Sequence, residues 1–175
     1  MSTVPVRFKT IVYRGGLVRF RIPAHWIEEY EPEGGGTFYE EGPDTGTLRL
    51  NVLTFESKQA DRMKSPSDFL STYVKELPDA EIIARTDGNA SLAFWKFHER
   101  DEEEPALAIR YWQVANRVLP LHMRLAVFSY TMLRSRKDDP RFIGEVRMIA
   151  DEVRRCTFAE QLGIQPSSDL SEGAN

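Results

Sequence analysis

Two short motifs between residues 30 and 50 could do chemistry, and each is better explained as a turn. Asp44-Thr45-Gly46 matches the tripeptide that carries the catalytic aspartate of aspartic proteases. Such an aspartate follows a hydrophobic strand and shares one proton with a second aspartate. Here Glu41-Gly42-Pro43 precedes the tripeptide, and the sequence holds no second copy of it. The motif therefore predicts a β-turn between two strands.

The triple glycine Gly34–Gly36 could cradle a phosphate. A phosphate loop opens into a helix N-terminus and usually has a lysine nearby. These glycines instead precede the strand pattern "TFYEEG", and every charged residue from Glu28 to Asp44 is acidic. A phosphate would be repelled there, so the glycines predict a flexible hairpin turn.

The remaining catalytic residue types are sparse. The histidines His25, His98 and His122 lie far apart and lack the spacing of metal ligands. Cys156 falls on the apolar seam of a predicted helix, where burial raises the pKa of a thiol and makes it a poor nucleophile. We therefore expect no catalytic residue, no metal and no cofactor, and we do not expect an enzyme.

Composition limits the classes of partner. The chain has 175 residues and a net charge of −4, which argues against a general nucleic-acid binder. The most apolar stretch, Val118–Leu133, is interrupted by His122 and Arg124 and is too short to span a membrane. The N-terminus has no apolar segment of signal-peptide length. We expect a cytoplasmic protein.

Two helices are predicted among strands. The first covers residues 66–77, because Ser65 and Asp68 form a capping box before an apolar stripe. The second covers residues 139–162 and ends before Gly163. On its polar face, Arg147, Asp151 and Arg154 have the spacing for ion pairs in solvent. We expect one domain over residues 1–162 and a flexible tail over residues 163–175.

The strands predict an α+β fold. Residues 10–23 read as a hairpin about Gly15-Gly16. In a later strand Leu92 and Phe94 point one way while Ala93 and Trp95 point the other, so that strand is buried on both faces. The prediction is an α/β/α sandwich with a central, mostly antiparallel sheet and a long C-terminal helix. The alternative is a helix-grip-like sheet around an aromatic cavity near Trp95 and Trp112, in a small-molecule-binding protein or an enzyme.

The order of motifs also suggests a family. A strand runs into Ile22-Pro23 and then Trp26, a hairpin passes through Phe38-Tyr39, and a Gly-x-Leu-x-Leu strand spans residues 46–50. The later motifs are Arg110-Tyr111-Trp112, Phe128-Ser129-Tyr130 and the helix containing "IADEVRRCTF".

Together these motifs resemble the PsbP-like superfamily, which includes extrinsic proteins of photosystem II and Ran-binding nuclear import factors of the Mog type. The chain is most similar to the bacterial relatives of these proteins. The resemblance covers residues 15–158 and rests on pattern and element order. It implies an α/β/α sandwich and a non-enzymatic role in binding or assembly. No functional residue carries over, because no binding motif aligns position by position.

Acidic clusters suggest how a partner could dock. One runs from Glu28 to Asp44, and the other is a predicted hairpin tip with Glu99, Asp101, Glu102, Glu103 and Glu104. Acidic side chains at strand ends can steer a basic partner. We therefore expect a protein partner that uses this acidic tip. The alternative is that these residues only keep the turns soluble, and the sequence leaves self-association open.

Overall fold

The computed structural model describes residues 6–59, 64–77, 79–99 and 104–160. The strands in this part of the chain are β1 (Phe8–Tyr13), β2 (Val18–Pro23), β3 (Ile27–Tyr30), β4 (Gly36–Tyr39), β5 (Thr47–Glu56), β6 (Glu81–Ala84), β7 (Ala90–His98), β8 (Leu107–Leu119), β9 (His122–Leu133) and β10 (Thr157–Phe158). The helices are α1 (Pro66–Val74) and α2 (Pro140–Arg154), with short 3-10 turns η1 (Arg14–Gly16) and η3 (Arg134–Arg136).

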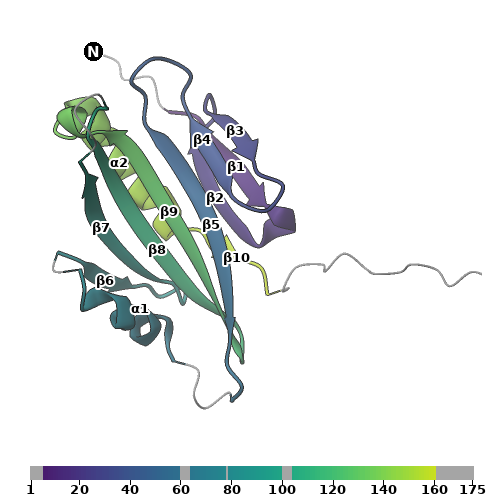
Figure 1. Ribbon diagram of the computed structural model, residues 1–175. Coiled ribbons are helices and arrows are strands. Elements are labelled where there is room, and N and C mark those ends of the chain that lie inside the picture. Colours follow the sequence, from purple (N-terminus) through teal and green to yellow (C-terminus); the bar gives the residue numbers. More distant parts are fainter. Residues whose placement is uncertain (1–5, 60–63, 78, 100–103, 161–175) are drawn as a thin grey trace, which may run out of the picture.

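The strands form two antiparallel sheets (Figure 1). The larger sheet has the order β3-β4-β5-β9-β8-β7-β6, and the smaller sheet has the order β1-β2-β10. Strands β5, β9, β8 and β7 follow one another through long antiparallel registers, which makes the centre of the larger sheet a rigid platform. The predicted hairpin about Gly15-Gly16 is confirmed as the β1–β2 connection.

Both helices begin where the sequence predicts, the first at its capping box. The Asp68 amide donates to Ser65 Oγ over 3.1 Å, and the Ser65 hydroxyl donates to the Asp68 carboxylate over 2.7 Å. Asp139 caps α2 by accepting a hydrogen bond from the Arg141 amide at 3.0 Å. In both helices a proline occupies the first turn, where its missing N–H is not needed. Helix α1 ends at Val74 rather than at residue 77.

The predicted end of the second helix at residue 162 is wrong, because α2 ends at Arg154. Arg155 leaves helical geometry with φ −95° and ψ 7°. Thr157–Phe158 then pair with β2 as an edge strand. The step from Val153 to Cys156 keeps helical spacing in the sequence, but a threonine and a phenylalanine suit a strand when a partner strand is available.

The larger sheet is covered on both faces, as Figure 1 shows, with α2 behind its long strands and α1 against its other side. On the α2 face, Trp112 and Phe128 pack with α2 and the smaller sheet. On the α1 face, Leu70 packs against Leu92 and Phe94. The fold is therefore α+β with mostly antiparallel sheets and a C-terminal helix, as predicted. The smaller sheet beside α2 was not predicted as a separate sheet.

The two motifs that could do chemistry lie in turns. Asp44 has a φ of 54°, in the turn that joins β4 to β5. Gly34 and Gly35 have φ values of 120° and 112°, which only glycine adopts readily, in the turn that joins β3 to β4. The Gly35 amide donates to the Tyr13 hydroxyl over 2.7 Å, so its hydrogen-bonding capacity serves the fold.

Two further predictions concern the C-terminal end of the chain and membrane-spanning helices. The predicted flexible tail, residues 163–175, lies outside the described residues. Within the described residues, neither α-helix combines the length and the apolar composition that crossing a membrane requires.

Candidate functional site

The predicted acidic tip lies between β7 and β8, and only part of it belongs to the described residues. Glu99 follows β7 and forms an ion pair with Arg134 of η3. Glu104 precedes β8 and is exposed. Asp101, Glu102 and Glu103 lie outside the described residues. The sequence did not connect Glu99 to Arg134, because the two residues meet only when β8 and β9 pair.

The other acidic cluster, residues 28–44, has basic neighbours from distant elements. Lys9 Nζ lies 2.9 Å from a Glu28 carboxylate oxygen. Arg141 of α2 lies 2.7 Å from the Glu40 carboxylate. These pairs neutralise part of the negative charge that the sequence shows in this region. The region is therefore not a uniformly acidic surface.

The aromatic residues of β7 and β8 lie on both faces of the larger sheet. Phe94 and Tyr111 stack on the α1 face, with ring centroids 5.0 Å apart. Trp95 and Trp112 lie on the α2 face. Trp95 and Trp112, near which the alternative prediction places an aromatic cavity, therefore share one face, and Trp112 lines a cavity whose other residues are mostly charged.

An exposed surface of aromatic and cationic side chains runs along the α2 face at the end of β7. The rings of Trp95 and Phe97 are nearly parallel, with centroids 6.2 Å apart. Arg110 Cζ and Lys137 Nζ lie 5.4 Å and 5.6 Å from the Trp95 centroid, and Arg134 Cζ lies 5.0 Å from that of Phe97. Cations are attracted to the faces of such rings. We call these residues the aromatic–cation ladder.

A cleft between β8 and α2 adjoins this ladder. Arg110 and Trp112 reach it from β8, where alternate residues share one face of the sheet. Arg147 and Arg154 reach it from α2. Its volume is about 400 Å³. We call it the arginine cleft, and its lining residues are Arg110, Trp112, Val146, Arg147, Ala150, Asp151 and Arg154.

The predicted ion pairs of Asp151 with Arg147 and Arg154 do not form. The ion pairs among the described residues include none for Arg110, Arg147 or Arg154. One carboxylate, that of Asp151, therefore stands among three arginines without contacting them. The lining of the arginine cleft carries a net positive charge.

Hydrogen-bond donors without acceptors lie beneath the lining of the arginine cleft. The Nε atoms of Arg110 and Arg154 and the indole nitrogen of Trp112 are buried, and none has a hydrogen-bond partner within the described structure. Burial, followed by repulsion from Arg154, lowers the pKa of the Arg110 guanidinium. Buried polar groups in folded proteins are nearly always paired. This arrangement can bind an anion.

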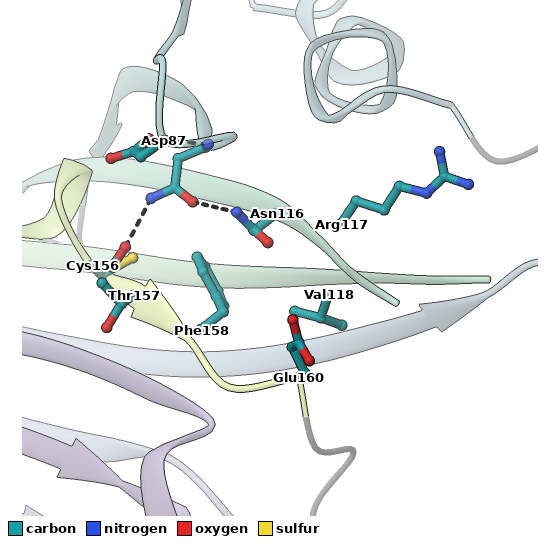
Figure 2. A pocket seen from close by; sticks show the side chains of 9 residues that line it. Asp87, Asn116, Arg117, Val118, Cys156, Thr157, Phe158 and Glu160 are labelled. Atoms are coloured by element: carbon teal, nitrogen blue, oxygen red, sulfur yellow. Dashed lines mark hydrogen bonds between the residues drawn. The ribbon is translucent and has the colours of Figure 1, made fainter. Parts of the chain in front are cut away.

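Figure 2 shows a second cavity, of about 240 Å³, beside the end of α2. Here two asparagines form a hydrogen-bond network with each other and with the backbone. The Asn89 amide donates to the Cys156 carbonyl over 2.8 Å, and the Asn116 amide donates to Asn89 Oδ1 over 2.8 Å. Burial raises the pKa of the Cys156 thiol. The predicted core position of Cys156 is confirmed, although Cys156 lies just beyond α2, and the network fastens this segment to the sheet.

The arginine cleft could not be located from the sequence. The only local signal was Arg147 and Arg154 two helical turns apart, and the intervening Asp151 made ion pairing the simpler explanation. Arg110 belongs to a strand far from α2 in the sequence. Among the described residues, no cluster of three or more His, Cys, Asp or Glu side chains could hold a metal ion.

Comparison with known proteins gives likeness at the level of fold. No protein-family model matches the sequence, and no curated protein matches it. A crystal structure of a protein from Bacteroides thetaiotaomicron VPI-5482 has a TM-score of 0.59 and 14% identity. The match covers 86% of this chain and 48% of that chain, so this chain spans about half the length of that protein.

Two further structures match over most of both chains. The Saccharomyces cerevisiae Ran-binding protein Mog1p has a TM-score of 0.52 and 14% identity, over 88% of this chain and 96% of that chain. LpqN of Mycobacterium tuberculosis, involved in cell envelope biogenesis, has a TM-score of 0.54 and 10% identity, over 88% and 91%. The predicted likeness to Mog-type proteins is therefore supported at the level of the fold alone.

Proposed function

We propose that this chain is a non-enzymatic protein-binding module of the PsbP-like type, from a bacterium and cytoplasmic, and that its partner docks on the aromatic–cation ladder. The ladder is the observation that carries the proposal. Phe97 is 46% exposed although it belongs to strand β7, where it pairs with Ala108 of β8, rather than to a loop. Side chains held by a rigid sheet lose little freedom when they are buried by a partner.

The composition of the ladder suits an interface. Tryptophan and arginine are enriched among the residues that dominate binding energy, and aromatic residues are enriched at interface cores. A partner that covers Phe97 and Trp95 buries ring surface, and carboxylates on that partner can pair with Arg134 and Lys137. Among solved structures of this fold, one is that of a Ran-binding protein, which agrees with a role in protein binding.

The acidic tip belongs to this proposal as the rim of the docking surface. Glu99 connects it to the ladder through the ion pair with Arg134. Rim charges act mainly on the rate of association and on its dependence on salt. We propose that Glu99, Asp101, Glu102, Glu103 and Glu104 select a partner whose own rim carries basic residues.

The test is affinity capture from native cell extract with the wild-type chain and two variants as bait. Phe97→Ser removes the exposed ring of the ladder. Leu53→Ser is the matched control, because Leu53 is similarly exposed at 48% but lies on the α1 face. We expect Phe97→Ser to lose proteins that the wild type and Leu53→Ser both retain. If Phe97→Ser recovers the same proteins in the same amounts, docking on the ladder is wrong.

A further variant, used as bait in the same way, tests the rim separately. Changing residues 101–104 to serine should leave the captured proteins the same at low salt and reduce the sensitivity of capture to added salt, because exposed charges are screened. An unchanged salt dependence would remove the acidic tip from the docking surface. Docking on the ladder would then be judged from the comparison of Phe97→Ser with Leu53→Ser alone.

A further inference from the structure

We propose that the arginine cleft is a binding site for a small organic oxyanion, in which a carboxylate or phosphate group is joined to a compact apolar group. The site adjoins the ladder and shares Arg110 with it, but its ligand is a small anion and not a protein. The argument rests on the unpaired charge in the cleft, on its orphaned donors, and on the shape and chemistry of its lining.

The unpaired charge contrasts with two nearby arginines, Arg141 of α2 and Arg21 of β2, which are paired with carboxylates. Arg141 donates to Glu145 of the next turn over 3.0 Å and to Glu40 over 2.7 Å. Arg21 of β2 forms a two-pronged pair with Glu152, at 2.7 Å for each bond. These two arginines therefore have carboxylate partners, whereas the three arginines of the arginine cleft have none among the described residues.

The donors without partners indicate which kind of chemical group would pair with them. The buried Nε atoms of Arg110 and Arg154 and the indole N–H of Trp112 can donate but cannot accept. The absent partner must therefore accept hydrogen bonds, and beside three guanidinium groups it is best negatively charged. A carboxylate or phosphate matches the planar, forked donor geometry of arginine. Both groups share this oxyanion chemistry.

The rest of the lining fits an apolar part of the same ligand. Val146 and Ala150 of α2 contribute aliphatic surface opposite the indole of Trp112. The volume of about 400 Å³ lies within the range of about 300–1,000 Å³ that is typical of small-molecule sites. The exposed carboxylate of Asp151 disfavours a ligand that extends a second negative group past it.

The proposal also predicts how arginine substitutions change the melting temperature of the protein without ligand. A structural arginine stabilises the fold, so its removal lowers the melting temperature. In the arginine cleft Arg110 is partly desolvated and is repelled by Arg154, so removal of either cation relieves a cost of the empty state. We expect Arg154→Gln and Arg110→Gln to melt no lower than the wild type without ligand. Arg155→Gln is the matched control, because Arg155 is the exposed neighbour of Arg154 and does not line the cleft.

The binding test uses phenyl phosphate and benzoate as probes, with benzyl alcohol as the neutral counterpart, at constant ionic strength set with sodium chloride. Thermal shift and calorimetry should show saturable binding of at least one anion to the wild type and to Arg155→Gln. Affinity should fall at least tenfold in Arg154→Gln and in Arg110→Gln. The tighter of the two anions identifies the preferred oxyanion. Equal affinity across all four proteins, or equal stabilisation by benzyl alcohol, overturns the proposal.

A titration of the wild-type protein tests the proposal even if the arginine variants fail to fold. The indole N–H signal of Trp112 in NMR spectra, assigned with Trp112→Phe, should move on titration with phenyl phosphate and with benzoate. The indole signal of Trp26 should not move, because Trp26 packs elsewhere, near Tyr130. A Trp112 signal that stays fixed at saturating concentrations of both anions overturns the proposal.

Discussion

Gly46 of the Asp-Thr-Gly motif allows a sharp test of how the core is packed. Its backbone φ is not in the left-handed region, so an alanine is permitted by the backbone itself. A Cβ atom there would lie 2.0 Å from the Tyr130 hydroxyl oxygen and 2.1 Å from its Cζ. Tyr130 is fully buried, stacks on Trp26 with centroids 6.3 Å apart, and donates a hydrogen bond to the Glu145 carboxylate. The ring cannot yield without losing these contacts.

The size of the effect follows from two terms. Overpacking a well-packed core costs about 1–3 kcal/mol. Losing a hydrogen bond to a charged group costs about 1.5–3 kcal/mol. Because the two losses share one movement of Tyr130, we expect Gly46→Ala to lower the free energy of unfolding by about 3 kcal/mol. Urea unfolding, followed by circular dichroism, measures this difference.

Gly144→Ala provides the control with the same chemical change. Gly144 lies within α2, and a Cβ atom there meets nothing within 4 Å. Alanine is the better helix former by about 1 kcal/mol, so Gly144→Ala should raise the free energy of unfolding by up to that amount. A Gly46→Ala protein as stable as the wild type would refute the close approach of Tyr130. A Gly144→Ala protein less stable than the wild type would refute the open surroundings of that residue.

Three further predictions concern caps and the single thiol. Ser65→Ala should lower the free energy of unfolding by about 1 kcal/mol through loss of the α1 cap, measured by urea unfolding, with an unchanged value counting against the cap. Cys156 should react with iodoacetamide at pH 8 only as fast as the protein unfolds, because it is buried and its thiol pKa is raised; fast labelling of the folded protein would contradict this. The hydrogen bonds from the Arg141 amide and then from Arg136 lower the pKa of Asp139. The contribution of the Asp139 carboxylate to folding stability is therefore present above its unfolded pKa of about 4, and it is lost as the pH falls through the folded pKa. The stability difference between wild type and Asp139→Asn should therefore shrink towards pH 2, and a constant difference would contradict the lowered pKa.

Local chemistry in the sequence was enough to predict most of the elements. Ser65 and Asp139 each precede a proline, and both helices start there. Gly15 has a φ of 68°, which is why the first hairpin could be located from its glycines. The spacing of Leu92 and Trp95 also predicted that β7 is buried on both faces. These signals depend only on neighbouring residues.

Features that depend on contacts between distant segments could not be predicted in the same way. The end of α2 is decided by the pairing of Thr157–Phe158 with β2, and no glycine or proline near Arg154 marks it. The acidic tip looked uncompensated because Glu99 and Arg134 are far apart in the sequence. The arginine cleft requires Arg110 of β8 to meet α2, and the spacing of charges along α2 pointed instead to ion pairs.

Arg110 connects the two proposed sites, because its guanidinium carbon lies 5.4 Å from the Trp95 ring centroid and 6.0 Å from that of Trp112. The same side chain therefore contributes to the aromatic–cation ladder and to the arginine cleft. An oxyanion that binds Arg110 in the cleft competes with the attraction between this cation and the Trp95 ring. Because the ladder uses Arg110 over the Trp95 ring, oxyanion binding in the cleft should weaken docking on the ladder. Such coupling is reciprocal: whatever factor an oxyanion exerts on partner affinity, the partner exerts the same factor on the affinity of the oxyanion.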